Sequence, residues 1–237
     1  MYERYVNFFT DFAFKKLFGT EENKDLLVSF LNASLCGKEV VVDLEYLDIE
    51  KFGNPLFVSG TILDVCCKTM DGRMFFLELQ NVGRQFCDQI VLENKHEGCL
   101  EPAYTISILD FSFDDSRSAY YLYEQSHIYL EMSKFIKLER DLESLLDKWM
   151  YAIKNMMILS EQPKALCEGV FAKFFEAAEI VNLNPQERAY YGGSLKNYRD
   201  WYSVVNTAIT RGREKGLVAG RVARERLEKE QNIRNLK

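Results

Sequence analysis

Proline and long apolar runs are scarce in this sequence of 237 residues. It has only four prolines and no Pro- or Ser-rich linker, so no domain boundary is evident before its last 27 residues. Apolar runs such as residues 104–113 are too short to cross a bilayer, and the first residues lack the pattern of a signal peptide. We therefore expect a cytoplasmic protein with no membrane partner, built from one domain (1–210) and a charged, basic tail (211–237).

Several catalytic motifs are also missing. The only histidines are His96 and His127, so neither a Cys/His nor a Ser/His/Asp arrangement is indicated. The six cysteines form no CxxC pair of the kind that holds zinc or exchanges thiols, which favours a reducing compartment. No GxxxxGK[ST] phosphate loop is present, so we expect no nucleotide cofactor.

Positive charge is in deficit overall but not at the C-terminal end. The net charge of −6 argues against a protein that coats nucleic acid non-specifically. The segment 211–237, however, has nine Lys or Arg and four Asp or Glu, a net +5 that leaves −11 on the rest. This tail has glycines at 212, 216 and 220, and it is open to three interpretations: a frayed helix, a solvent-facing extension or a self-association element.

The remaining 47% hydrophobic and 14% aromatic content is that of a globular chain, and its periodicity predicts helices, then strands, then helices. This order indicates either an α+β domain or an α/β domain with a mixed sheet. The first predicted helix is 3–17, with Gly19 at its end, and a second helix follows, capped by Thr20 and closed by Gly37. Further helices are predicted at 84–97, along an apolar stripe from Leu138 to Ile153, at 164–180 and at 186–209. The predicted strands are 40–47, 61–69, 73–80, 103–113 and 127–132.

The segment 61–80 reads as a β-hairpin with a turn at Asp71-Gly72, and the length of that turn decides where its acids point. A two-residue loop would place Asp64 and Glu78 on opposite faces. A three-residue loop of residues 70–72, with Gly72 left-handed, would pair them directly and bring Gln80 to the same face.

In the second register two carboxylates face each other within apolar strands, which is unfavourable unless something compensates them. Mg²⁺ or Mn²⁺ suits such oxygen ligands, with Asp64 and Glu78 holding the ion and Gln80 aligning a water molecule. Two alternatives remain open at this point. A lysine among Lys15, Lys16 and Lys68 would pair the acids as a salt-bridge cluster, or a different register would expose them.

Several ordered segments resemble a known family. They are Thr10-Asp-Phe-Ala-Phe-Lys-Lys-Leu-Phe-Gly19, residues 23–32, Ile62-Leu-Asp-Val65, Phe76-Leu-Glu-Leu-Gln-Asn81, Tyr104-Thr-Ile-Ser-Ile-Leu-Asp-Phe111, residues 128–135 and Lys148-Trp149. Across roughly residues 8–205 the chain resembles the recombination-promoting nucleases, which are also described as transposases of the PD-(D/E)XK nuclease family.

This resemblance implies a restriction-endonuclease-like core with N-terminal helices and a C-terminal helical region. It also implies metal-dependent cleavage of double-stranded DNA, in recombination or in mobile elements. Asp64 and Glu78 match the metal-ligand positions, and Gln80 takes the place where much of the superfamily has lysine. Asp11 matches an acidic position of the N-terminal motif, either as an accessory site residue or as a solvated residue near a turn.

The segment after the second hairpin strand departs from the family pattern. Only 21 residues separate Gln80 from Pro102, where the family normally has a long helix. Arg84 and Gln89 are the candidates for what remains of its substrate-binding role. Three interpretations follow: an active endonuclease, for which a homodimer would allow both strands to be cut; a catalytically impaired relative that binds DNA or self-associates; and a domain whose acids are structural.

Overall fold

The protein is described from a computed structural model that covers residues 3–47, 62–82, 103–111, 120–124 and 126–235. The helices are α1 (Asp11–Phe18), α2 (Lys24–Leu35), α5 (Leu145–Asn155), α6 (Val170–Ala178) and α7 (Pro185–Asn235), with short 3-10 turns at Glu21–Asn23, Met132–Lys134, Glu139–Asp141, Met156–Ile158, Lys164–Leu166 and Ile180–Asn182. The strands are β1 (Val41–Tyr46), β2 (Ile62–Thr69), β3 (Met74–Val82), β4 (Tyr104–Leu109), β5 (Tyr121–Glu124) and β6 (His127–Glu131).

The strands form one mixed sheet in the order β1-β2-β3-β4-β6-β5. The β1–β2, β2–β3 and β5–β6 pairs are antiparallel, whereas β4 is parallel to both β3 and β6. The five predicted strands are confirmed apart from their end residues, and β5 was not predicted. The fold is therefore α+β with a mixed sheet, and the prediction of a helix at 84–97 lies outside the described residues.

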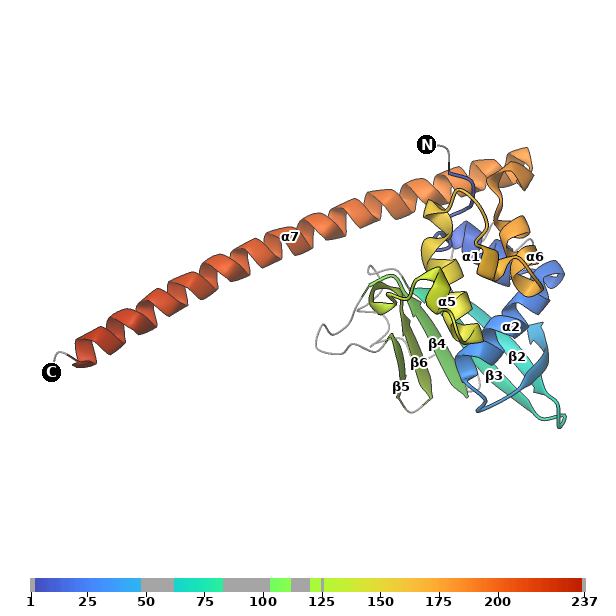
Figure 1. Ribbon diagram of the computed structural model, residues 1–237, viewed down its shortest axis with the longest axis horizontal. Coiled ribbons are helices and arrows are strands. Elements are labelled where there is room, and N and C mark those ends of the chain that lie inside the picture. The colour runs from blue at the N-terminus through green and yellow to red at the C-terminus, as the bar shows by residue number, and fades with distance from the viewer. Residues whose placement is uncertain (1–2, 48–61, 83–102, 112–119, 125, 236–237) are drawn as a thin grey trace. The chain divides into compact units, whose positions relative to one another are not determined.

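One face of the sheet is apolar and forms the core with the helices. Alternate strand residues on this face are buried: Leu63, Val65, Cys67, Leu77, Leu79, Ile106, Ile108, Ile128 and Leu130. Figure 1 shows α2 and α5 lying across the sheet. Trp149 of α5 is fully buried among the rings of Phe18, Phe30, Phe171 and Phe174, which come from three other helices. Because aromatic rings bury the most apolar surface, this cluster holds the helices on the sheet.

The N-terminal segment is extended where a helix was predicted from residue 3. The N–H of Val6 donates to the carbonyl of Ala178 (2.9 Å) and the carbonyl of Arg4 accepts from Ile180 (2.9 Å), so this segment pairs with the chain after α6. Helix α1 begins only at Asp11, after Thr10, whose hydroxyl accepts the N–H of Ala13. The apolar spacing in residues 3–10 therefore reflects burial in a short extended segment and the turn that follows it, rather than a helical stripe.

The ends of α1 and α2 confirm one predicted cap and correct another. Gly19 ends α1, and its N–H donates to the carbonyl of Lys15. Thr20 does not cap α2, because a 3-10 turn intervenes and its hydroxyl donates instead to the carbonyl of Lys16. Helix α2 ends at Leu35, and both Cys36 and Gly37 have positive φ.

Helix α5 begins later than the predicted leucine stripe. Leu138 is exposed and lies before a 3-10 turn, and the helix begins at Leu145. The hydroxyl of Ser144 accepts the N–H of Asp147 (3.0 Å) while the Asp147 carboxylate accepts the N–H of Ser144 (3.0 Å), which is a capping box. This reciprocal cap sets the start of the helix more strongly than the apolar spacing upstream.

The C-terminal helices differ from the prediction in length. The helix predicted over 164–180 is shorter, as α6, and is preceded by a 3-10 turn. Helix α7 continues to Asn235, well beyond the predicted end at residue 209, so residues 211–235 are helical. The chain divides into two compact units, Met1–Lys196 and Asn197–Lys237. Across the described ranges, no helix is both long and apolar enough to span a membrane.

Asp147 is the centre of a buried polar cluster in the first unit. Its carboxylate accepts the phenol of Tyr120 (2.7 Å), the ammonium of Lys137 (2.8 Å) and backbone N–H groups of Glu143 and Ser144. Burial opposes its ionisation, but these hydrogen bonds hold the pKa of Asp147 below its ordinary value. The ionised carboxylate therefore ties the residue before β5 and the segment after β6 to the start of α5.

We expect Asp147→Asn to lower the free energy of unfolding at neutral pH by about 2 kcal/mol, because the ion pair and part of the hydrogen bonding are lost. Since the pKa of Asp147 is lowered in the folded state, its contribution is present at neutral pH and declines as the pH falls below the ordinary value of 3.8. Urea denaturation of both proteins at several pH values checks this. A difference that stays constant down to pH 2 would contradict it.

Candidate active site

The turn between β2 and β3 has three residues, as the prediction that joined Asp64 to Glu78 required. The N–H of Thr69 donates to the carbonyl of Arg73 (2.9 Å), and Gly72 has a φ of 82°. The carboxylate of Asp71 accepts from the hydroxyl of Thr69 and from the guanidinium of Arg73 (2.7 Å). These bonds lower the pKa of Asp71 to about 2, so they stabilise its ionised form in the turn.

This turn gives the register that places the predicted site residues together. Asp64 pairs directly with Glu78, and Ile62 pairs with Gln80. Directly paired residues share a face of the sheet, so Asp64, Glu78 and Gln80 all lie opposite the apolar face. Glu78 is buried, with 9% of its surface exposed, whereas Asp64 and Gln80 are half-buried. The alternative register, with the two acids on opposite faces, is wrong.

Gln80 is held from two sides. Its Nε2 donates to Oε1 of Glu78, and its Oε1 accepts the hydroxyl of Ser107 on β4 (3.2 Å). A primary amide has two N–H groups and two acceptor lone pairs, so one N–H and one lone pair of Gln80 are left after these bonds. The side chain is thereby oriented along the polar face, with hydrogen-bonding capacity for a water molecule.

The parallel strands extend this polar face in two rows. Glu78 pairs with Thr105, which pairs with His127, and Gln80 pairs with Ser107, which pairs with Tyr129. Thr105 and Ser107 are buried polar residues in an otherwise apolar strand. None of these four residues was predicted as a site residue, although polar residues at alternate positions of an apolar strand are a signal that could have found them.

Three lysines were proposed as alternative partners of the acids. Lys68 is exposed, and Lys15 and Lys16 lie close to other carboxylates. Lys16 lies 2.7 Å from the carboxylate of Glu187, and the buried Lys15 lies 3.5 Å from that of Asp11. Asp11 is the first residue of α1 and is partly exposed. Its accessory role in the site stays a prediction, and Arg84 and Gln89 lie outside the described residues.

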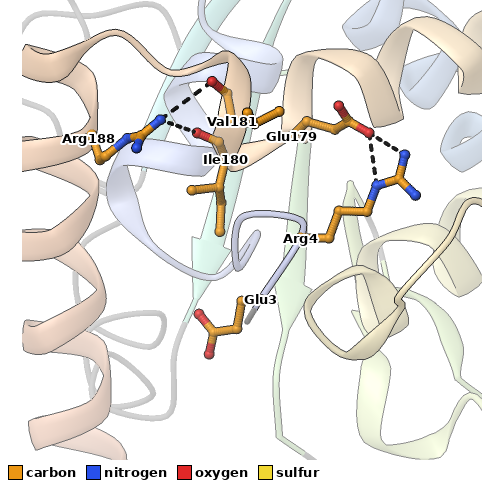
Figure 2. A pocket seen from close by; sticks show the side chains of 6 residues that line it. All are labelled: Glu3, Arg4, Glu179, Ile180, Val181 and Arg188. Carbon is orange, nitrogen blue, oxygen red and sulfur yellow. Dashed lines mark hydrogen bonds and ion pairs between the residues drawn. The ribbon is translucent and has the colours of Figure 1, made fainter. Parts of the chain in front are cut away.

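A pocket of about 430 Å³ lies apart from these strands, lined by Glu3, Arg4, Glu179, Ile180, Val181 and Arg188. Figure 2 shows that its two arginines are engaged within the fold. Arg4 donates to the carboxylate of Glu179 (2.9 Å and 2.5 Å), and Arg188 donates to the carbonyls of Ile180 and Val181. The pocket therefore lies where the N-terminal segment meets the chain around the start of α7. It contains none of the predicted site residues.

The donor set on the polar face suits a hard divalent cation. Mg²⁺ is often bound by one or two carboxylates, with water molecules and substrate phosphates completing its shell. Asp64 and Glu78 supply these two carboxylates from directly paired positions. Within the described residues, no group of three or more His, Cys, Asp and Glu side chains offers a fuller ligand set. The residues present therefore fit Mg²⁺ or Mn²⁺ better than zinc, which prefers nitrogen and sulfur.

The mixed sheet with helices is consistent with a restriction-endonuclease-like fold. Residues 8–208 match the model of the PD-(D/E)XK nuclease family transposases, and the chain belongs to this family. Comparisons with curated proteins and with solved structures gave no match. The family is one of nucleases, which are hydrolases, and its members in general use divalent metal ions. A DNA substrate is the one that the family suggests.

We expect Glu78→Gln to leave the free energy of unfolding of the metal-free protein unchanged, or to raise it by up to about 1 kcal/mol. The substitution removes one of two facing carboxylates but keeps an oxygen that can accept from Gln80. Urea denaturation in EDTA measures the effect. Glu45→Gln is the matched control, since Glu45 is an exposed carboxylate paired with Cys66 on the same face.

The opposite result has a clear meaning. A loss of about 3 kcal/mol or more in Glu78→Gln, with none in Glu45→Gln, would be typical of removing one member of a buried ion pair. In that case the carboxylate is compensated by a cation of the protein itself. The acids would then be structural, as the third interpretation of the sequence holds.

Proposed function

We propose that this protein is a metal-dependent endonuclease that hydrolyses phosphodiester bonds in double-stranded DNA. The observation that carries the proposal is the direct pairing of Asp64 with Glu78, with Gln80 on the same face. Placing two carboxylates opposite each other in a sheet is unfavourable, so a fold that keeps them there has a use for their combined charge. Membership of a nuclease family supports the same conclusion.

The three side chains have different roles in the proposed reaction. Asp64 and Glu78 hold Mg²⁺ or Mn²⁺ through carboxylate oxygens, one from each strand of the hairpin. When bound, such an ion lowers the pKa of a coordinated water molecule and stabilises the charge that builds on the phosphate. Gln80 forms a hydrogen bond with the attacking water, as donor or as acceptor. Ser107 acts through Gln80 as a positioning residue.

The biological setting is part of the same proposal. The family includes transposases, so we propose that cleavage serves recombination or the movement of mobile elements. One site cuts one strand at a time, and a homodimer would place a second site for the other strand. The basic tail, with its net charge of +5, is suited to contacts with DNA phosphates.

Purified protein should nick or linearise supercoiled plasmid with Mg²⁺ or Mn²⁺ and should be inactive in EDTA. Asp64→Asn and Glu78→Gln should each lower the rate by at least about 100-fold, because each removes a ligand charge that acts in the transition state. Gel electrophoresis of timed samples measures both effects. Glu45→Gln should cleave at the wild-type rate, since its carboxylate is exposed on β1.

Inactivity of the folded wild-type protein with both metals would overturn this proposal. The interpretation of an impaired relative that binds DNA would then take its place. Binding of a labelled duplex, measured by fluorescence anisotropy on the same preparation, distinguishes that relative from a domain with structural acids. Only the impaired relative is expected to bind.

Ser107→Ala should lower kcat by about tenfold with little change in KM, because one hydrogen bond that orients Gln80 is lost. Ser34→Ala is the control. Ser34 is also a buried serine, but its hydroxyl has no hydrogen-bond partner in the described part of the chain. Steady-state cleavage of a labelled duplex gives both constants. Equal effects of the two substitutions would show that Ser107 acts on stability alone.

A further inference from the structure

His127 and Tyr129 lie on the same face of the sheet as the proposed site. Strand register places His127 two strands from Glu78 in one row and Tyr129 two strands from Gln80 in the next. Strands are spaced about 4.8 Å apart, so each aromatic residue lies about 10 Å across the sheet from its acidic or amide counterpart. That distance is about three nucleotides at the rise of 3.4 Å of a stacked DNA strand.

The two rings stand side by side on this face in a stacked arrangement. The imidazole of His127 and the phenol of Tyr129 are nearly parallel, at 12°, with their centroids 6.1 Å apart. Both side chains keep part of their surface exposed, whereas Ile128 and Leu130 on the opposite face of β6 are fully buried. The pair is therefore placed differently from a core aromatic cluster such as that of Trp149.

Partly exposed aromatic rings beside a nuclease site are suited to stacking with nucleobases. Every base has a π-face, and stacking on an aromatic side chain stabilises a bound strand whatever its sequence. In an intact duplex, however, the base faces are already stacked on their neighbours. Only an unpaired nucleotide could offer its base to these two rings.

We propose that His127 and Tyr129 form a stacking subsite for an unpaired base about three nucleotides from the scissile phosphate. This inference rests on the proposed nuclease function and narrows its substrate class. Duplex DNA that contains a gap, a flap or a frayed end beside the cleaved bond is bound more tightly than a continuous duplex. The two residues bind and position the strand, and they are not catalytic residues.

The experiment measures binding and cleavage of two labelled substrates, a continuous duplex and the same duplex with a short gap. Full-length protein is used, with anisotropy in EDTA for binding and Mg²⁺ for cleavage. We expect the wild type to prefer the gapped substrate. Tyr129→Ala should weaken binding of the gapped substrate by about tenfold and leave binding of the continuous duplex unchanged, because stacking on one aromatic side chain is lost.

A conservative variant separates stacking from hydrogen bonding. Tyr129→Phe keeps the ring and removes the hydroxyl, so it should bind the gapped substrate as the wild type does. His127→Ala should weaken binding of the same substrate. Tyr190→Ala, which removes an exposed aromatic side chain at the start of α7, is the control for a general loss of aromatic surface. Thermal melting verifies that each variant is folded.

The outcomes separate this inference from the proposed function. If Tyr129→Phe is as weak as Tyr129→Ala, the hydroxyl rather than the ring makes the contact, and the stacking subsite is refuted. Metal-dependent cleavage that is equal for both substrates and unaffected by Tyr129→Ala would also refute it while leaving the nuclease intact. Loss of gapped-substrate binding in Tyr129→Ala, in a protein that cleaves nothing, would retain the subsite and refute the nuclease.

Discussion

The three-residue turn at 70–72 fixes the sheet face on which each residue of β2 and β3 lies. Because side chains alternate along a strand, one residue fewer in this turn would move Glu78 to the face that packs on the helices. Leu77 and Leu79 would then lie on the polar face in its place. The positive φ of Gly72 and the bonds of Asp71 favour the longer turn, so a local feature of the backbone determines both the core and the site.

Structural features that depend on residues close together in the sequence could be predicted. The hairpin and the five longer strands follow from alternation and from an Asp-Gly turn, and Gly19 follows from its place after an apolar stripe. The register of the hairpin stayed open between a two-residue and a three-residue turn, and the structure decides it. The features that depend on distant partners could not. Residues 3–10 share the spacing of a helix, but residues 4–6 pair with the chain at the end of α6. Ser107 and Tyr129 join the polar face only through parallel pairing, which the sequence does not specify.

The two faces of the sheet require different kinds of side chain from the same strands. The apolar face is filled by Leu, Ile and Val under a cluster of aromatic rings around Trp149, and it tolerates no charge. The polar face has acids, an amide and hydroxyls at the intervening positions. Strand β4 meets both requirements in six residues. Ile106 and Ile108 lie on the apolar face, and Thr105 and Ser107 lie on the same face as the acids. A core of this kind gives the site a rigid base.

The mixture of antiparallel and parallel pairs has a consequence for the order of assembly during folding. Asp64 and Glu78 are separated by a short turn, so closing their hairpin costs little chain entropy and is fast. The pairing of β3 with β4 joins residues about 27 apart, as in Gln80 and Ser107, and is slower to form. The pairing of the two acids therefore closes over a shorter stretch of chain than the contact between Gln80 and Ser107. The proposed site is complete only when the whole sheet has closed.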